Sequence, residues 1–230
     1  MQQETDRALK VMRQSHRMIW IDSELTGLDV ERDEVMEIAV VVTESNPHFW
    51  PLHGIRGMEV ETMSIVIHLD DNTLESMSRW FKSQHGKSGL IEESRNSNIS
   101  CEMAEEELLD MLRRHTVEGM STLAGDKVGR TRMFIDRKMP RLAKWLSRKT
   151  KDVFDIGVAV KEFKPNIYKN RPMKSFGHRA LTDINECIAE YTFYYDNQIK
   201  CPADAPRNWE CEEGFSSDDT SCGGYYDVGF

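Results

Sequence analysis

The 230-residue sequence has few cysteines and no long hydrophobic run, and both absences exclude classes of protein. Its five cysteines are spread along the chain without a CxxC pair, so neither a disulfide framework nor a zinc site is expected. No segment approaches the roughly 20 apolar residues that a membrane-spanning helix requires. We therefore expect a protein of a reducing compartment that does not span a membrane.

The beginning of the chain lacks the features of a targeting segment. Residues 1–17 mix Glu4 and Asp6 with four basic residues and contain no apolar stretch. This composition argues against a secretory signal and against an acid-poor transit peptide. We expect a polar N-terminal extension and a cytoplasmic location, with the mitochondrion and the nucleus left open.

An excess of positive charge is also missing. The formal net charge is −9, and residues 201–230 carry most of it, with seven acidic residues against Arg207. A protein that binds long nucleic acids by releasing counterions from many phosphates would usually be basic. The charge therefore disfavours binding to long duplexes, and any polyanionic ligand must be bound locally, for instance through metal ions.

The sequence does have the content of a globular protein. Apolar residues make up 39% of the chain and include nine Phe and five Trp, which is more than a disordered chain would carry. From about residue 200 the apolar pattern fails, and prolines, acids and Gly223-Gly224 follow. We predict a polar extension at 1–17, one folded domain at 18–199 and an acidic disordered tail at 200–230.

Apolar and β-branched residues predict strands in the first half of the domain. Alternating or continuous apolar stretches predict strands at 18–22, 35–43, 61–68 and 121–125. Residues 26–29 are expected to form a turn, and residues 45–60, which contain two Pro and two Gly, a loop.

Helical spacing of apolar residues dominates the rest of the domain. It predicts helices at about 72–82, 102–114, 131–147, 156–163 and 179–197, with a short element at 152–154. Early strands with helices between and after them indicate an α/β fold in which helices flank a central sheet.

Two carboxylates lie close together in the first predicted strand. Asp22 and Glu24 are two residues apart, so the pleat of a strand points both to the same face. Such a pair can supply oxygen ligands to Mg²⁺ or Mn²⁺. A solvated strand end is the alternative interpretation, because Asp-x-Glu alone is a weak signal.

A second pair of polar residues, His178 and Asp183, lies at the start of the last predicted helix. A neutral imidazole there can accept a proton from water that attacks a phosphodiester, while the nearby acid binds a metal ion. An exposed histidine in a helix N-terminal turn is the alternative. The two pairs together favour a catalytic site over either alternative.

These residues lie in segments that resemble a known family, the oligoribonucleases. Residues 18–28, Met-Ile-Trp-Ile-Asp-Ser-Glu-Leu-Thr-Gly-Leu, together with 29–33 and 37–39, resemble the first exonuclease motif of that family. Residues 178–184, His-Arg-Ala-Leu-Thr-Asp-Ile, resemble its third motif. Shorter matches fall between them in the order of the family: Trp80, His85, Ser88-Gly89-Leu90, Leu123-Ala124-Gly125, Met139-Pro140 and Asp152-Val153. The resemblance covers about 18–197.

The resemblance implies a DEDDh exonuclease with an RNase-H-like fold, in which a central mixed β-sheet is flanked by helices. Such enzymes trim very short RNAs from the 3′ end with two divalent ions, Mg²⁺ or Mn²⁺, one activating water and the other stabilising the leaving oxygen. Asp22, Glu24 and Asp183 would then be metal ligands, and His178 would be the general base.

The resemblance also implies how substrate is bound. Leu28 would wedge between the last two bases, and Trp80 and His85 would line the pocket of the terminal nucleotide, where stacking is worth about 1–3 kcal/mol per base. Core packing is the alternative for Leu28 and Trp80. Short single-stranded RNA and a second copy of the chain in a homodimer are the implied partners.

The second motif departs from the family. Its metal-binding Asp is replaced by Thr131, whose neutral hydroxyl is a poor ligand for a divalent ion. Asp126, where the family has Asn, is a candidate to compensate, with a solvated loop acid as the alternative. Asp136 is expected to be structural.

Further departures affect the groups that would bind the 5′ phosphate. Lys127 replaces a Ser, Ser147-Arg148-Lys149 replaces a His-Tyr-Arg loop, and Phe154-Asp155 replaces a pair of hydroxyl residues. Lys127 and Arg148 are expected to contact a phosphate.

Three functions compete on this sequence. The first is a 3′-to-5′ exoribonuclease with an altered second metal site, and the second is a pseudo-exonuclease that binds short RNA ends or a protein partner. A DNA-acting proofreading exonuclease fits the first motif less well. The retention of Asp22, Glu24, His178 and Asp183 favours the exoribonuclease.

Overall fold

The computed structural model describes residues 2–44, 59–175 and 177–199. The predicted tail at 200–230 and most of the predicted loop at 45–60 therefore lie outside the described residues, and the tail stays a prediction. No helix in the described part of the chain is long and apolar enough to cross a membrane.

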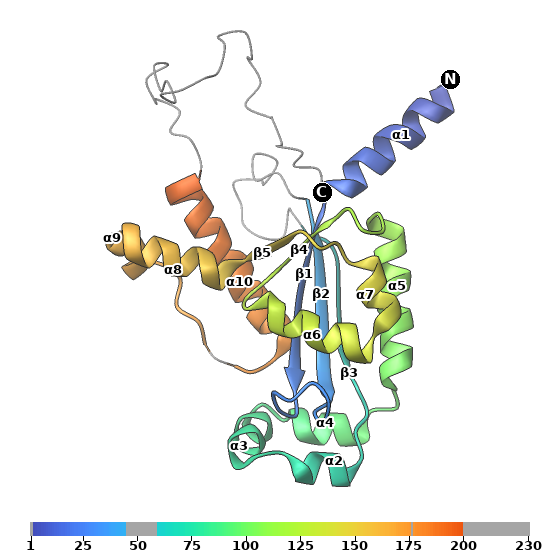
Figure 1. The fold of residues 1–230 in the computed structure, drawn as a ribbon, viewed down its shortest axis with the longest axis vertical. Coiled ribbons are helices and arrows are strands. Elements are labelled where there is room, and N and C mark those ends of the chain that lie inside the picture. Colours follow the sequence, from blue (N-terminus) through green and yellow to red (C-terminus); the bar gives the residue numbers. More distant parts are fainter. Residues whose placement is uncertain (1, 45–58, 176, 200–230) are drawn as a thin grey trace.

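A five-stranded mixed sheet forms the centre of the fold, in the order β3-β2-β1-β4-β5 (Figure 1). The strands are β1 (Met18–Leu25), β2 (Val35–Thr43), β3 (Glu59–Val66), β4 (Thr122–Gly125) and β5 (Thr150–Asp152). β1, β2 and β3 pair antiparallel, whereas β4 pairs parallel with β1 and β5 parallel with β4. The predicted α/β class and the RNase-H-like mixed sheet are confirmed.

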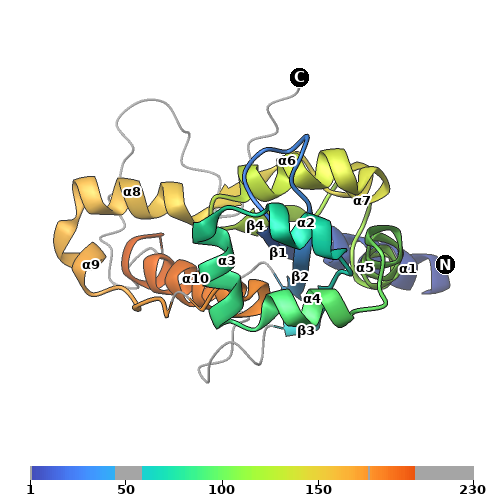
Figure 2. The ribbon, with the colours of Figure 1, turned by 90° about the horizontal axis from the view of Figure 1, so that it is seen from below.

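Both faces of the sheet are covered, which explains why β2 is buried along its whole length. One face packs on α5 (Cys101–His115), α6 (Val128–Lys138) and α7 (Pro140–Trp145), and the other on α8 (Val153–Phe163) and α10 (Ala180–Tyr194). Figure 2 shows α6 and α7 on one side of the strands and α10 on the other.

The side chains of β1 alternate between these two faces. Met18 and Trp20 pack in the core beneath α10, and Ile19 and Ile21 in the core beneath α5 and α6. The alternation continues to the end of the strand, so Asp22 and Glu24 lie on the α10 face.

Three short helices lie beyond the end of β1 (Figure 1). They are α2 (Asp71–Ser76), α3 (Arg79–Lys87) and α4 (Leu90–Asn96). The prediction of one helix at 72–82 was wrong, because Met77 is extended, with ψ of 145°, and Ser78 caps a new helix through Phe81 N. The helix α4 was not predicted.

The helix predicted at 131–147 is also divided. α6 begins earlier, at Val128, and ends at Lys138, and Pro140 begins α7. Proline disfavours a helical conformation in the residue before it, and Met139 accordingly has φ of −133° and ψ of 65°.

The N-terminal extension is helical, which its polar composition did not predict. α1 (Gln2–Ser15) projects from the domain near the start of β1 (Figure 1). Gln14 Nε2 donates to the carbonyl oxygen of Arg114 at 2.7 Å, which joins the end of α1 to the end of α5. The short helix α9 (Pro165–Lys169), which follows α8, was not predicted. At its C-terminal end, α10 continues into a π-helical turn, η3 (Tyr195–Ile199).

Candidate active site

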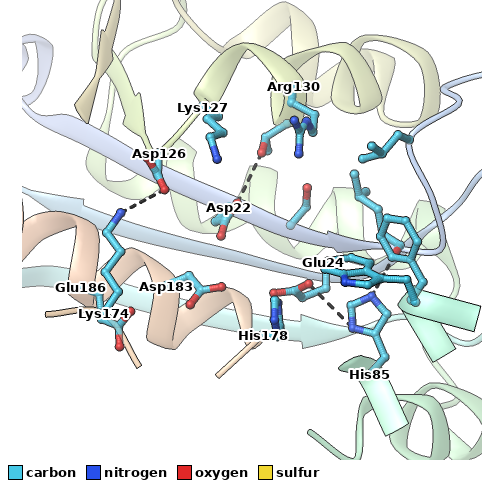
Figure 3. A pocket seen from close by; sticks show the side chains of 16 residues that line it. Asp22, Glu24, His85, Asp126, Lys127, Arg130, Lys174, His178, Asp183 and Glu186 are labelled. Carbon is cyan, nitrogen blue, oxygen red and sulfur yellow. Dashed lines mark hydrogen bonds and ion pairs between the residues drawn. The ribbon is translucent and has the colours of Figure 1, made fainter. Parts of the chain in front are cut away.

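A cavity of about 390 Å³ opens where β1 and β4 end, between α3, α6 and the start of α10. It brings together most of the predicted site residues, which are far apart in the sequence (Figure 3). They are Asp22, Glu24, Leu28, Trp80, His85, Asp126, Lys127, His178 and Asp183. Arg148 is exposed and does not line this cavity, so a contact between Arg148 and substrate inside one chain is not supported.

Three carboxyl groups crowd one side of the cavity. Asp22 and Glu24 come from β1, and Asp183 comes from the first turn of α10. Burial, helped by the nearby Asp183 and Asp126, raises the pKa of Asp22 to about 7. Burial and neighbouring carboxylates also raise the pKa of Glu24 and of Asp183. Ionising all three groups together is therefore costly unless positive charge is supplied.

The donor set fits a divalent cation that prefers oxygen ligands. Carboxylate oxygens are the ligands that Mg²⁺ and Mn²⁺ prefer, and a cation would stabilise the ionised carboxylates, whose pKa values are raised first by burial and then by mutual repulsion. Asp126 Oδ1 and Glu186 Oε2 are buried in the same cavity without a hydrogen-bond partner. In the part of the chain that the structure describes, no three acidic, His or Cys side chains stand in ready-made ligand geometry. Binding would therefore have to draw the carboxylates together.

Thr131 occupies the α6 side of the cavity opposite Asp22. Its side chain is buried, and Oγ1 donates to Asp22 Oδ1 at 3.5 Å. The hydroxyl contributes a neutral dipole where a carboxylate would contribute charge. This side of the cavity therefore has less capacity to hold a cation than the side formed by β1 and α10.

The carboxylate of Asp126 is paired with a cation of the chain itself. Lys174 Nζ lies 3.0 Å from Asp126 Oδ2 (Figure 3). It also lies 3.0 Å from Glu190 Oε2. Burial alone would lower the pKa of Lys174, but these two hydrogen bonds raise it above its ordinary value. One oxygen of Asp126 thus serves the ammonium group, and only Oδ1 is left for another ligand.

His178 lies just before α10 in an unusual backbone conformation. Its φ is +50°, in the left-handed region that non-glycine residues rarely adopt and that costs on the order of 1–3 kcal/mol. The ring packs edge-on against Trp80, with 5.9 Å between the ring centroids. The imidazole lines the same cavity as Asp22, Glu24 and Asp183 (Figure 3).

His85 is buried and is held as a neutral imidazole. Burial lowers its pKa, and Nε2 donates to the carbonyl oxygen of Leu25 at 3.0 Å, because a carbonyl can only accept. Its Nδ1 is therefore unprotonated, lies 3.8 Å from Glu24 Oε2 and makes no hydrogen bond with the described residues. A buried acceptor thus faces Glu24 without a hydrogen bond among the described residues.

Two apolar side chains form the outer wall. Leu28 is 59% exposed and Trp80 is 56% exposed, so the alternative that they are core residues is wrong. Trp80 is braced by Phe81, with ring centroids 4.9 Å apart and nearly perpendicular planes. An exposed indole fixed by its neighbours offers a flat face to a base.

Basic residues line the side of the cavity formed by the start of α6. Lys127 and Arg130 extend toward the cavity opposite α10 (Figure 3), and neither is in an ion pair within the described residues. Arg130, Lys174 and Glu186 were not predicted as site residues. The three-residue spacing of Lys127 and Arg130 in a helical turn could have indicated Arg130. Lys174 lies in a coil, and no local sequence pattern indicates that its side chain reaches the cavity.

Asp136 pairs with Arg132 at 2.7 Å, in keeping with the structural role expected for it.

The chain is similar to a known protein family as a whole and to individual members of it. The model of the exonuclease family matches residues 19–191. The mitochondrial oligoribonuclease of Homo sapiens is 36% identical over 200 residues, which cover 87% of this chain and 81% of that protein. The oligoribonuclease of Bordetella pertussis is 36% identical over 185 residues, covering 80% of this chain and 97% of that protein.

Solved structures share the fold at low sequence identity. The zinc-bound complex of E. coli ExoI with single-stranded DNA superposes with a TM-score of 0.61 at 15% identity, covering 80% of this chain and 41% of that chain. The Mg²⁺- and Mn²⁺-bound structure of S. pombe Pop2p superposes with a TM-score of 0.57 at 11% identity, covering 86% of this chain and 90% of that chain. Both support the RNase-H-like fold.

Proposed function

The chain belongs to the oligoribonuclease group of the exonuclease family, and on that premise we propose that it hydrolyses short RNAs from the 3′ end. The observation that carries the proposal is the convergence of Asp22, Glu24 and Asp183 with His178 in one cavity. An active 3′-to-5′ exoribonuclease is preferred to a protein that only binds RNA ends, and the cytoplasm is its proposed location.

Asp22, Glu24 and Asp183 would hold the divalent cofactor, Mg²⁺ or Mn²⁺. When bound, the cation supplies Lewis-acid activation of water and neutralises charge that develops on the phosphate. The raised pKa values of these carboxyl groups, which come first from burial and then from neighbouring carboxylates, support this role, because a bound cation would stabilise the ionised forms. Asp126 Oδ1 is a further donor in the same proposal.

His178 is proposed as the general base. An unprotonated ring nitrogen accepts a proton from the attacking water while the water oxygen bonds to phosphorus and the bond to the leaving 3′ oxygen breaks. That oxygen takes up a proton and leaves as the 3′ hydroxyl of the shortened RNA. The half-buried position of His178 beside Asp183 supports this role, because the carboxylate stabilises the imidazolium that forms.

Substrate binding is assigned to the outer wall and the basic side of the cavity. Trp80 stacks on the terminal base, Leu28 separates it from the preceding base, and His85 lines the pocket of the terminal nucleotide. Lys127, with Arg130, binds phosphate. Arg148 would reach substrate only from the second copy of a homodimer, which is part of the same proposal.

The test uses the full chain with Mg²⁺ or Mn²⁺ and 5′-labelled RNAs from a dinucleotide upward. We expect stepwise release of mononucleotides from the 3′ end, which Asp22→Ala abolishes. The matched control is Asp110→Ala, which removes an exposed carboxylate of α5 that pairs with Arg113 and does not line the cavity. Binding of RNA without release of mononucleotides above the Asp22→Ala background would leave only the non-cleaving alternative.

A further inference from the structure

Glu37 is a buried carboxylate that the proposed reaction does not use. It lies in β2 directly opposite Glu24 of β1 and is only 2% exposed. Two carboxylates facing each other across adjacent strands repel, and a buried charge needs hydrogen-bond partners or an opposite charge. Glu37 has both. Ser64 Oγ donates to its Oε1 at 2.9 Å, and the backbone N of Ala180 donates to its Oε2 at 3.1 Å.

The opposite charge comes from Arg179. Its Nε and Nη2 donate to the two oxygens of Glu37 at 3.1 and 3.2 Å. The same guanidinium also donates hydrogen bonds to Glu93 of α4, from Nη1 to Oε1 at 2.9 Å and from Nη2 to Oε2 at 2.8 Å. One planar fork thus bridges β2, α4 and the start of α10, a geometry that a single ammonium group cannot reproduce.

The bridge is joined directly to the proposed catalytic groups. His178, with its φ of +50°, is the residue immediately before Arg179, and Asp183 N donates to the carbonyl oxygen of Arg179 at 3.0 Å. The helix α10 has no side-chain cap of its own, and Glu37 takes that place through Ala180 N. The position of His178 and Asp183 relative to Glu24 is therefore set by where Arg179 is held.

We propose that Arg179 is a positioning residue, which holds His178 and Asp183 against β1 by bridging Glu37 and Glu93. It also balances the charge of Glu37 next to Glu24. This inference rests on the proposed function for its effect on turnover, but the placement of His178 can be measured without turnover.

The variants are chosen to separate position from charge. Arg179→Gln removes the fork, and Arg179→Lys keeps the charge without it. The matched control is Arg95→Gln, because Arg95 also pairs with two carboxylates, Asp71 and Glu92, outside the cavity. Glu93→Gln weakens only the exposed contact of the bridge, between Arg179 and Glu93. It replaces Arg179→Gln as the test variant if Arg179→Gln does not fold.

The first readout is the imidazole signal of His178 in a histidine ¹H–¹³C spectrum of the metal-free protein, assigned with His178→Gln. We expect Arg179→Gln to shift or broaden this signal, with Glu93→Gln changing it less. The signal of the exposed His68 should stay in place in both variants, and Arg95→Gln should leave the His178 signal unchanged. A His178 signal that is unchanged in Arg179→Gln, or in Glu93→Gln where the former does not fold, overturns the inference.

The second readout is turnover of a dinucleotide. We expect kcat to fall by roughly a hundredfold in Arg179→Gln, since a displaced base or ligand costs rate more than binding, with KM nearly unchanged. Arg179→Lys should recover part of kcat. A rise in KM with kcat unchanged contradicts a positioning role. If the wild-type chain itself does not cleave, the proposed function fails, and the His178 signal alone decides the inference.

Discussion

The hydroxyl of Thr131 donates to Asp22 across the cavity, with 3.5 Å between Thr131 Oγ1 and Asp22 Oδ1. A carboxylate in place of this hydroxyl would add a hard anionic ligand beside Asp22. We therefore predict that Thr131→Asp raises Mn²⁺ affinity by roughly tenfold or more, because the number of charged ligands tunes affinity over orders of magnitude. Calorimetric titration of the purified chain with Mn²⁺ measures this, and cleavage of short RNA should rise with it.

Thr131→Val is the control, since it removes the hydroxyl without adding a ligand. It should leave Mn²⁺ affinity near that of the wild type. Without metal, Thr131→Asp should melt at a lower temperature, because it adds a carboxylate to a cluster that already resists ionisation. Unchanged Mn²⁺ affinity and cleavage would show that residue 131 does not face the cation or that Asp126 already fills the role.

The pKa values of the acidic cluster predict how stability depends on pH. In the folded chain the pKa of Asp22 is raised to about 7, and those of Glu24 and Asp183 are also raised. A carboxyl group with a raised pKa favours the folded state while it is protonated. This contribution is lost as the pH rises from the unfolded values toward the folded ones. Metal-free protein should therefore melt several degrees lower at about pH 8 than at about pH 5.

Mg²⁺ or Mn²⁺ should reverse this trend, because the cation binds the ionised cluster. Thermal unfolding in chelator and in metal, at both pH values, measures the difference. Asp22→Asn should flatten the metal-free pH dependence, whereas Asp110→Asn, at an exposed carboxylate of α5, should not change it. An equal melting temperature with and without metal at the higher pH contradicts the assignment of these ligands.

Trp80 should contribute to binding and little to stability. The side chain is 56% exposed, so Trp80→Ala removes little buried surface. Stacking on a base is worth about 1–3 kcal/mol, which corresponds to roughly five- to 150-fold in affinity. We expect a loss of that size for a dinucleotide bound in Ca²⁺, measured by fluorescence anisotropy, with the melting temperature within a few degrees of the wild type.

Trp80→Phe should recover part of the affinity, because a smaller aromatic ring still offers a face to the base. Phe163→Ala is the matched control, since Phe163 is an exposed aromatic residue that does not line the cavity. It should bind the dinucleotide like the wild type. Equal affinity of Trp80→Ala and Phe163→Ala would remove Trp80 from the substrate site.

Strands β1 to β4 were predictable because local pattern and tertiary environment agree there. Residues 35–43 are rich in β-branched residues and buried on both faces, and the observed strand β2 has the same bounds. The division of the region 72–82 was not foreseen, since apolar spacing continues across Met77 although Ser78 starts a new helix. Capping geometry decided that boundary, and an apolar pattern does not show caps.

The site was predictable only in part. The strand period places Asp22 and Glu24 on one face, but their meeting with Asp183 depends on packing between distant segments, which came from the resemblance rather than from the pattern. The bridge from Arg179 to Glu37 joins residues 142 positions apart, and no local periodicity encodes it. Lys174 lies in a coil, and its contact with Asp126 in the cavity is also one that no local periodicity encodes.

Lys127 and Arg130 should give substrate binding its dependence on salt. Both line the cavity without an ion pair in the described part of the chain, so their charge is available to a phosphate. Each contact between a basic residue and a phosphate of single-stranded RNA contributes roughly 0.7 to the slope of log affinity against log salt concentration. Lys127→Gln and Arg130→Gln should each lower the slope by about that amount, additively in the double variant.

The slope is measured by titrating the protein with a dinucleotide that carries a 5′ phosphate, in Ca²⁺ and at several salt concentrations. Arg137→Gln is the control, because Arg137 is exposed on the same helix and paired with Glu31 at 3.1 Å. Slopes of both single variants equal to that of Arg137→Gln would mean that the phosphate is bound elsewhere.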